Sequence, residues 1–335
     1  MSTERRGLLA GGNFIVDRIK TIDAYPAQDT LASILSESIS NGGGPYNVLR
    51  DLAAMGAGYP LEAAGMVGSD ADGDWVTEDC KRRGIDTRQL HRHPEAPTSY
   101  TDVMSVAGSG RRTFFHRRGA NALLDLEHFD FSATRARIFH LGYLMLLDRF
   151  DEIADGVCKA SLLLARAREA GMQTSVDFVS APHPAFSEIA RSTLPQVDHL
   201  LLNEIEAGMI LKITLDAAQP SGLEKAASDL LGWGVHRSVV IHFEGGAVAA
   251  TREEGSLFQA SLALPEGYSQ GATGAGDAFA AGYLHGVHEQ LNLDTRLKLA
   301  MCTAAACLSH ASPSEGMRDI GSCRTLTDRY GWRAP

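Results

Sequence analysis

The residues whose types and spacing could carry out chemistry gather in Gly271–Gly282, which reads GATGAGDAFAAG. Glycines lead into a helical pattern, and one carboxylate, Asp277, stands just inside it. The amides of Gly274, Ala275 and Gly276 come before the first intrahelical acceptors, so they can converge on an anion at the positive end of the helix dipole. A carboxylate beside such an anion can deprotonate an attacking hydroxyl. The run therefore predicts phosphoryl transfer, and a turn whose acid merely favours the helix start is the alternative.

A second glycine-rich turn precedes the predicted helix Pro45–Met55. The segment NGGGPYNVLRDLAAMG places Gly42 and Gly43 where the backbone can run against a ligand, and Asn47 follows at the helix start. An amide side chain offers both a donor and an acceptor, as the hydroxyls of a polyol require. These three residues are therefore predicted to bind a polyol, with a glycine turn capped by Asn47 as the alternative.

Two further carboxylates follow predicted strands. Asp17 stands five residues after Gly12 in GNFIVD and is predicted to accept hydrogen bonds from substrate hydroxyls, because a charged acceptor binds a diol strongly. Glu206 stands three residues after Asn203, directly behind the predicted strand His199–Leu202, so both lie on one helix face. Carboxylate oxygen suits Mg²⁺, commonly through water. The alternatives are a solvated Asp17 and a simple cap built from Asn203 and Glu206.

The elements that must position these residues alternate along the chain. Short apolar runs predict buried strands at Leu8–Ala10, Leu61–Val67, Ile138–Leu141, Thr174–Phe178, His199–Leu202 and Ser238–Phe243. Helical periodicity predicts helices at Pro45–Met55, Asp74–Arg83, Lys159–Ala170, Glu204–Leu211 and Leu223–Leu231. This alternation predicts a mostly parallel sheet with helices on both faces, which is a three-layer α/β/α fold.

Three segments break the alternation and predict exposed strands. Thr98–Val106 and Arg111–Arg117 flank the turn signal Gly108-Ser109-Gly110, and Thr30–Ser38 mixes apolar and serine positions. Together they predict a small antiparallel sheet, with strands from about 14–40 and 97–118, beside the main part of one domain spanning 1–335. The apolar face of such a sheet must close over a ligand or pair with another subunit.

Composition narrows the classes of function. The 335 residues are 44% apolar and carry a formal net charge of −10, with no basic run that would track nucleic acid. The five cysteines, an odd number without CxxC spacing, argue against disulfides or structural zinc. His91 and His93 lack partners spaced for a metal. Without an apolar run long enough for a membrane span, the chain is expected to be a soluble cytoplasmic protein.

These motifs together resemble the ribokinase-like carbohydrate kinase family, also called PfkB, over nearly the whole chain. The most specific match is ATGAGDAFAAGY, Ala272–Tyr283, followed by NGGGPYN, GNFIVD and the NxxE element at Asn203. The resemblance implies an ATP-dependent sugar kinase in which Asp277 is the catalytic base and the amides of 274–277 form the anion hole. It also implies Mg²⁺, a β lid over the acceptor, and a homodimer formed through that lid.

The resemblance extends to residues that no local pattern singles out. It implies that the acceptor meets the hairpin end TFFHRRGAN, and that Asp177 also faces it. The implied acceptor set is Asp17, Gly42, Gly43, Asn47, Phe115, Arg118, Asn121 and Asp177. The residues implied to bind the nucleotide are Asn203, Glu206, Gly245, Gly246 and Thr273. The helix and loop at 304–316 are implied to lie near the nucleotide base. Gly245 and Gly246 are otherwise ordinary turn glycines.

Two departures from the family pattern leave questions open. Relatives commonly begin the signature with an aspartate that helps to hold potassium where potassium activates, and Gly271 and Ala272 stand here instead. Monovalent-cation dependence therefore stays open. No arginine follows Asp177 closely, which weakens the case for a carboxylated sugar. A nucleoside kinase and a catalytically silent regulator remain alternatives, whereas LLAGGNFIVD lacks the GxGxxG spacing of a dinucleotide-binding oxidoreductase.

Overall fold

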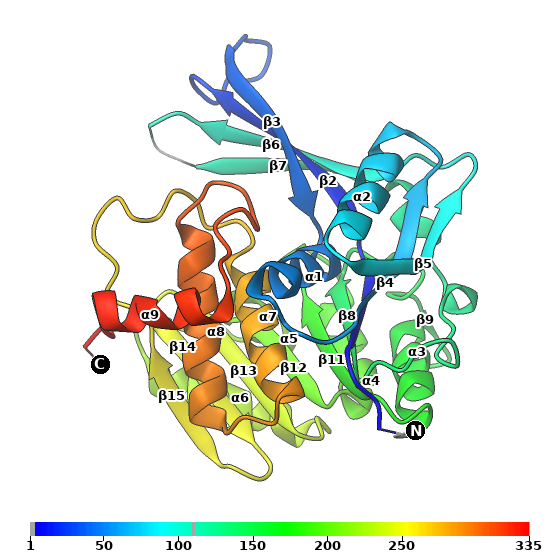
Figure 1. The fold of residues 1–335 in the computed structure, drawn as a ribbon, viewed down its shortest axis with the longest axis vertical. Helices are drawn as coiled ribbons and strands as arrows, with labels where there is room; N and C mark the ends of the chain where they lie inside the picture. The colour runs from blue at the N-terminus through cyan, green and yellow to red at the C-terminus, as the bar shows by residue number, and fades with distance from the viewer. Residues whose placement is uncertain (1–3, 109–110, 335) are drawn as a thin grey trace.

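A computed structural model describes residues 4–108 and 111–334 of the chain. One large twisted sheet runs through it with helices on both sides, and a smaller sheet projects from one end (Figure 1). We call the smaller sheet the lid. Ser109 and Gly110, in the predicted turn between two lid strands, lie outside the described residues.

The central sheet has nine strands in the order β15-β14-β13-β12-β11-β8-β1-β4-β5. Its strands are β1 (Leu8–Gly12), β4 (Leu61–Gly68), β5 (Ile85–His93), β8 (Ile138–Leu144), β11 (Gln173–Phe178), β12 (His199–Asn203), β13 (Ser238–Phe243), β14 (Gly246–Thr251) and β15 (Ser256–Ala260). All neighbours pair in parallel except β14, which is antiparallel to both β13 and β15. All six predicted apolar strands are confirmed.

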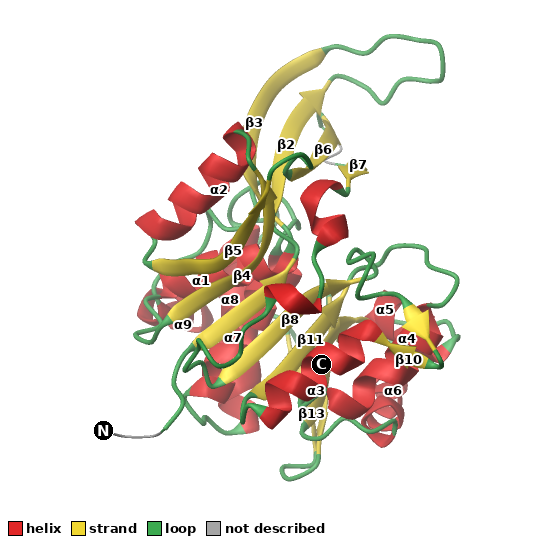
Figure 2. Ribbon diagram, turned by 90° about the vertical axis from the view of Figure 1, so that its right-hand side faces the viewer, coloured by secondary structure: helices red, strands yellow, loops and turns green. Residues whose placement is uncertain are grey.

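Helices cover both faces of this sheet, as Figure 2 shows, and the three-layer prediction is confirmed. One layer holds α1 (Gly44–Met55), α2 (Ala71–Arg82), α7 (Ala275–His288) and α8 (Leu293–Leu308), with α9 (Ile320–Tyr330) against α8. The other holds α3 (Lys159–Glu169), α4 (Phe186–Thr193), α5 (Glu204–Leu211) and α6 (Pro220–Gly232). Alternation along β1 serves both layers, since Leu8 and Ala10 pack in one core and Leu9 in the other.

The lid contains four strands in the order β3-β2-β6-β7. They are β2 (Ile15–Ile22), β3 (Ile34–Gly42), β6 (Ser99–Val106) and β7 (Arg112–Arg117). The pairs β2/β3 and β6/β7 are antiparallel, whereas β2 and β6 run parallel because both leave the main sheet in the same direction. The predicted strand Thr30–Ser38 was wrong at its start and its end, since the strand begins at Ile34 and continues to Gly42.

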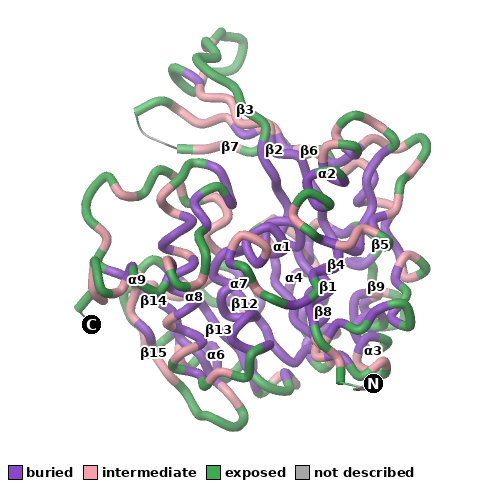
Figure 3. The backbone as a smooth tube through the Cα atoms, in the orientation of Figure 1, coloured by how far each residue is buried: buried purple, intermediate pink, exposed green. Residues whose placement is uncertain are grey.

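The lid is the least buried part of the fold, as Figure 3 shows by its green and pink strands above a purple core. On β3 the residues from Ile34 to Ile39 are exposed, and burial begins at Ser40, where the strand meets α1. Asn41 and Gly42, at the end of the strand, therefore lie in the protein interior. In the described residues no helix has the length and apolar character needed to cross a membrane.

Candidate active site

A cavity of about 730 Å³ opens at the carboxyl ends of the parallel strands. Tyr143, Asp177, Asn203 and His242 line it from the ends of β8, β11, β12 and β13. The amino-terminal turn of α7 closes one side, and Phe114 of β7 reaches it from the lid. Ligands of open parallel α/β sheets bind at this edge, outside the strand ends.

Asp277 is the central carboxylate of this cavity and is 4% exposed. The Tyr143 phenol donates to both of its oxygens, at 2.7 and 2.8 Å, and Asn47 Nδ2 donates to Oδ2 at 2.7 Å. Burial raises the pKa of Asp277 to about 7, the negative charge of Asp177 adds to the rise, and the two donors oppose it. An acid with a pKa near neutrality can take a proton from a hydroxyl and release it again.

The turn before α7 presents unpaired amides beside Asp277. Gly274 caps the helix with φ of 80°, and a Cβ added there would lie 2.6 Å from Pro313. Across the described residues, no acceptor bonds the amides of Gly274 and Gly276, whereas Ala275 N donates to Ala272 O at 3.3 Å. The prediction for Ala275 is therefore corrected, because its amide closes the turn. The remaining donors stand at the positive helix end, where an anion is stabilised.

Asn47 points at Asp277 and is itself held by a chain of side chains. Asn41 Nδ2 donates to Asn47 Oδ1 at 2.6 Å and to Ser314 Oγ at 3.0 Å, and the Arg50 guanidinium donates to Asn41 Oδ1. Asn47 lies within α1 and does not cap it, since the structure gives no side-chain cap at Gly43. This chain fixes the amide that donates to Asp277.

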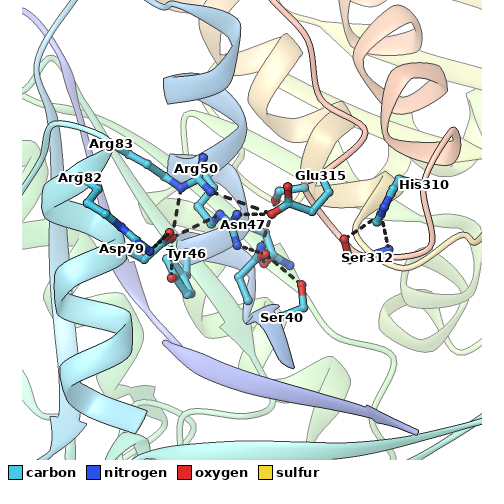
Figure 4. Close-up of polar contacts among 12 residues, drawn as sticks. Ser40, Tyr46, Asn47, Arg50, Asp79, Arg82, Arg83, His310, Ser312 and Glu315 are labelled. Carbon is cyan, nitrogen blue, oxygen red and sulfur yellow. Dashed lines mark hydrogen bonds and ion pairs between the residues drawn. The ribbon is translucent and has the colours of Figure 1, made fainter. Parts of the chain in front are cut away.

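Arg50 anchors this chain between α2 and the loop that follows α8, as Figure 4 shows. Its guanidinium lies 3.4 Å from the Asp79 carboxylate on α2 and donates to Glu315 Oε1 at 2.6 Å. Asp79 also pairs with Arg82 and Arg83, at 3.0 and 3.1 Å. Arg50 is 3% exposed, so its charge is neutralised inside the protein rather than by water.

Asp17 is 8% exposed and pairs with Thr101 of β6, on the face of the lid sheet that also carries Phe114. It is not among the residues that line the cavity. Burial raises its pKa to about 7, a Thr101 hydrogen bond lowers it, and the Asp277 charge raises it further. A side chain on Gly42 would overlap this carboxylate. Gly43 has φ of 88°, and a side chain there would overlap the carbonyl of Asn13. The two predicted glycines therefore make room for Asp17 and for the turn into α1.

Asp177 ends β11 beside the base. His140 Nε2 lies 3.6 Å from its carboxylate, and burial raises the Asp177 pKa, which the histidine opposes. A side chain on Gly142 would overlap Asp177 Oδ1, so this glycine lets the acid face β8. Asp177 lines the cavity as predicted.

Asn203 and Glu206 form a reciprocal cap at the start of α5. Asn203 Oδ1 accepts from Glu206 N at 2.8 Å, and Glu206 Oε2 accepts from Asn203 N at 2.9 Å. Ser180 Oγ donates to Glu206 Oε1 at 2.9 Å. Burial raises the Glu206 pKa to about 8, and the charges of Asp177 and Asp277 raise it further. Mutual repulsion among these carboxylates favours a cation in the cavity.

The donor set fits a metal bound through water. Among the described residues, no group of three or more histidine, cysteine, aspartate or glutamate side chains is placed to chelate a metal directly. Glu206 lines the cavity, and Mg²⁺ commonly keeps several waters and takes one or two carboxylates plus phosphate oxygens. The predicted role of Glu206 as a ligand through water is compatible with this arrangement.

The lid residues predicted to face the acceptor lie elsewhere. Phe115 points to the outer face of β7, against Met104 and Ile34, whereas its neighbour Phe114 lines the cavity. Arg118 pairs with Asp148 at 3.0 Å. Adjacent residues of a strand lie on opposite faces, so Phe114 and not the predicted Phe115 borders this cavity, and the stack of Phe115 on the acceptor stays a prediction.

Asn121 is also set apart from the cavity, because its Nδ2 donates to Phe14 O at 3.2 Å and the residue is 1% exposed. Gly245 and Gly246 form the turn from β13 to β14, and it is Phe243 and Glu244 that reach the cavity. Both glycines are required by their surroundings, since a side chain would crowd the Phe243 ring at one and overlap Gln259 O at the other.

Four residues that sequence reasoning did not single out belong to the site. Tyr143 and His242 each stand one residue before the end of a buried strand, and that position at a parallel strand end was the available signal. Phe114 could have been found from the alternation of side chains along its strand. Arg112, whose guanidinium donates to Thr273 Oγ1, carried none.

The chain was compared with known proteins. Residues 12–320 match the family model described as pfkB family carbohydrate kinase. A 5-dehydro-2-deoxygluconokinase from Shouchella clausii is 22% identical over 296 residues, which cover 86% of this chain and 86% of that protein. The match confirms the resemblance drawn from the signature at Ala272–Tyr283.

Solved structures share the fold. The ribokinase of Arabidopsis thaliana, complexed with ribose and ATP, superposes with a TM-score of 0.75 at 22% identity, covering 96% of this chain and 98% of that one. A nucleoside kinase of Methanocaldococcus jannaschii superposes with a TM-score of 0.76 at 16% identity, covering 98% of this chain and 100% of that one. At these identities the likeness establishes the ribokinase-like α/β fold.

Proposed function

Because the chain belongs to the pfkB family of carbohydrate kinases, phosphotransferases with an alcohol acceptor, we propose that it transfers the γ-phosphoryl group of ATP to a hydroxyl of a sugar or sugar-like acceptor. One observation carries the proposal. A buried carboxylate with a pKa near 7, Asp277, stands beside the unpaired amides of Gly274 and Gly276, and all three open on one cavity. Base and anion site are thus adjacent, as phosphoryl transfer requires.

The reaction assigns each group a task. The acceptor oxygen forms a bond to the γ-phosphorus while the bond from that phosphorus to the bridging oxygen of ADP breaks, and the electron pair leaves with ADP. Asp277 takes the hydroxyl proton. The amides of Gly274 and Gly276 stabilise charge on the transferring phosphoryl. Asn47 and Tyr143 hold the base, and Asp17 accepts from acceptor hydroxyls on the lid side.

Magnesium supplies positive charge against the phosphates when it is bound. In this proposal Glu206 holds it through water, with Asn203 and Ser180 fixing the carboxylate by the hydrogen bonds described above. Asp177 adds negative charge on the same side of the cavity. The raised pKa values of these acids fall when a cation enters, because their mutual repulsion is then offset.

The test of the proposal is Asp277→Asn, which keeps the shape of the side chain and removes the base. We expect ATP and acceptor to bind as in the wild type while kcat falls by about 10²- to 10⁴-fold. ADP release against a panel of sugars and nucleosides measures turnover, and calorimetry measures binding. Glu266→Gln, at an exposed position outside the cavity, is the matched control. Normal turnover of Asp277→Asn would remove the assigned base.

The same panel decides the acceptor class, and with it the nucleoside alternative. The shared fold of sugar and nucleoside kinases does not separate them, since a ribokinase and a nucleoside kinase superpose on this chain equally well. A catalytically silent regulator is distinguished by ATP consumption with any acceptor. Running each reaction with and without potassium measures the effect of Gly271 and Ala272.

Self-association through the lid and a cytoplasmic location complete the proposal. On the outer lid face the exposed apolar side chains of Tyr25, Ile34 and Phe115 lie around Met104. A second copy would cover this face, because β3 is also an edge strand. Light scattering on the purified protein is expected to give twice the chain mass of 35.9 kDa. A monomer at micromolar concentration contradicts this part.

A further inference from the structure

The phenol of Tyr143 lies across the open edge of the Asp277 carboxylate. Its oxygen is 2.7 Å from Oδ1 and 2.8 Å from Oδ2, so it is nearly equidistant from the two. Asn47 Nδ2 takes a second position on Oδ2, at 2.7 Å. A hydroxyl that gives its proton to Asp277 must come within hydrogen-bond reach of one of these oxygens. The Tyr143 oxygen therefore stands where such a hydroxyl has to bind.

The cavity ends at this side chain. Tyr143 is partly buried and lines the cavity beside Asp177 and Asp277. A side chain on Gly44 would place its Cβ 2.7 Å from Tyr143 Cε1, so the ring packs against the start of α1. In the part of the chain that the structure describes, the residues expected to bind the acceptor from that side do not line the cavity, and these are Gly42, Gly43 and Asn47. The ring thus lies between the cavity and the turn into α1.

The backbone holds Tyr143 in this place, but its hydroxyl has one partner. Asn13 N donates to Gly142 O at 3.1 Å, and Asn13 Nδ2 donates to Tyr143 O at 3.2 Å. Within residues 4–108 and 111–334, the hydroxyl bonds to Asp277 and to no other group. Burial raises the Tyr143 pKa, and the charges of Asp277 and Asp177 raise it further. The phenol therefore keeps its proton and donates to the base as one hydroxyl of an acceptor would.

Water is the competitor that such a site must exclude. The cavity of about 730 Å³ has room for it, since one water takes about 30 Å³. A water at Asp277 would form a bond from its oxygen to the γ-phosphorus, while the bond to the bridging oxygen of ADP breaks and its electron pair leaves with ADP. Asp277 would take the proton. ATP would then be hydrolysed without any acceptor being phosphorylated.

We propose that the Tyr143 hydroxyl occupies the acceptor's position at Asp277 while no acceptor is bound, and thereby keeps the base from activating water against ATP. The inference rests on the proposed kinase function. An acceptor replaces the phenol because its other hydroxyls bind at the same time, to Asp17 and Asp177. A water brings no such further contacts, so it does not displace a phenol that its own strand holds beside the carboxylate. Tyr143 thus decides between two kinds of hydroxyl.

The competing role for Tyr143 is that of a permanent partner that only sets the acidity of Asp277. Both roles predict a shifted pH profile in Tyr143→Phe, so the profile does not separate them. They differ in the reaction without acceptor, at a pH where the base is ionised. Only a phenol that holds the place of a reacting hydroxyl leaves, when it is removed, a position at Asp277 that water fills.

The experiment measures ADP release from ATP and Mg²⁺ alone at pH 9. For Tyr143→Phe we expect this hydrolysis to rise about tenfold over the wild type, the factor that one lost hydrogen bond to a charged group represents. Tyr143→Leu removes the hydroxyl together with the outer part of the ring and is expected to rise at least as much. In the double variant Tyr143→Phe with Asp277→Asn, the rate is expected to return to the wild-type value or below, because no base deprotonates the water.

Three controls make the test specific. Tyr268→Phe removes a tyrosine hydroxyl outside the cavity and is expected to keep the wild-type rate. Thermal unfolding of each variant verifies that it folds. Mass spectrometry of the wild type after incubation with ATP and Mg²⁺ is expected to show an unmodified Tyr143. A phosphorylated Tyr143 would make the phenol itself an acceptor and overturn the inference.

The outcomes separate the inference from the proposed function. If the wild type phosphorylates an acceptor and both Tyr143 variants hydrolyse ATP at the wild-type rate, the kinase function stands and Tyr143 does not exclude water. A rise that persists in the double variant would also overturn the inference, since the water is then not activated by Asp277. If the wild type phosphorylates no acceptor while Tyr143→Phe gains hydrolysis that depends on Asp277, the function fails and the role of Tyr143 survives. Both fail if neither activity is found.

Discussion

The acidity of Asp277 reflects a balance between burial and three hydrogen bonds. Burial and the Asp177 charge raise its pKa to about 7, and the donors Asn47 and Tyr143 hold it from rising further. Tyr143 gives two of the three contacts, at 2.7 and 2.8 Å. An incoming acceptor hydroxyl must compete with this phenol for the carboxylate. Tyr143 therefore sets both the acidity and the accessibility of the base.

Replacing Tyr143 by Phe is expected to move the pH profile to higher pH. The lost hydrogen bond lowered the Asp277 pKa, so the pKa rises above about 7 in the variant, and the carboxylate is ionised only at higher pH. At pH 6.5 the variant loses activity, about tenfold for each unit of pKa rise, and it recovers near pH 9. The measurement is kcat/KM from pH 5 to 9. Tyr268→Phe, outside the cavity, is expected to keep the wild-type profile.

At the scale of elements, β7 shows how one strand serves two surfaces. Phe114 and Phe115 are 56% and 51% exposed, yet one lines the cavity and the other lies against Met104 on the outer face. Successive side chains of a strand point to opposite faces, so a one-residue shift would exchange their roles. One face of the strand therefore borders the cavity, and the other belongs to the surface through which we propose self-association.

This pair of phenylalanines makes a matched test. Phe114→Ala is expected to raise the acceptor KM about tenfold, because an aromatic wall of the cavity is lost, and to leave the oligomeric state unchanged. Phe115→Ala is expected to weaken self-association and leave the KM unchanged. Steady-state kinetics and light scattering are run on both. An equal rise in KM for the two variants would show that the lid faces are not independent.

The clamp between α1, α2 and the 309–316 loop gives a second prediction at this scale. Arg50→Met removes the partner that Asp79 and Glu315 share. We expect a loss of about 3 kcal/mol in the free energy of unfolding. We also expect a reduced kcat, because Asn41 and Asn47 lose the hydrogen bond that holds them in place. Urea denaturation measures the first and ADP release the second. Arg82→Ala, which breaks an exposed contact to Asp79, is expected to cost less than about 1 kcal/mol.

Local patterns predicted the strands and the glycine turn with Asp277, whereas the other residues around the cavity are brought together by contacts between distant parts of the chain. The glycine turn and Asp277 could be recognised because their chemistry is built within one helix start. Tyr143 could not, since its role depends on β8 ending beside α7. For Phe114 and Phe115 the alternation was readable, but the sequence does not say which face meets the cavity. Arg112 donates from the lid to Thr273, and no spacing in the chain indicates that contact.

At the scale of the whole molecule, the buried Asp51 lowers the stability of the folded protein at neutral pH. It is fully buried in α1, and burial raises its pKa well above the usual value, an effect that Ser314 offsets only in part. The Asp277 charge raises it further. A raised pKa means that the folded state holds this proton more tightly than the unfolded chain, so stability falls as pH rises above about 4.

Asp51→Asn removes this dependence and is expected to stabilise the protein at pH 8. Each unit by which the wild-type pKa is raised corresponds to about 1.4 kcal/mol at pH values above both pKa values, and the advantage of the variant disappears below pH 4. Urea unfolding at pH 4, 6 and 8 checks this, with the exposed Glu266→Gln as the control. A constant difference between Asp51→Asn and the wild type at every pH would show that ionisation is not the cause.

The hydrogen bond from Asn47 to Asp277 joins residues 230 positions apart. A ribosome releases the first of these long before the second, and chains of this length fold through partly formed species. Until the last quarter of the polypeptide has emerged and docked, a nascent chain has neither its proton acceptor nor its oxyanion cradle. A chain that ends before Asp277 therefore lacks the groups on which the proposed phosphoryl transfer depends.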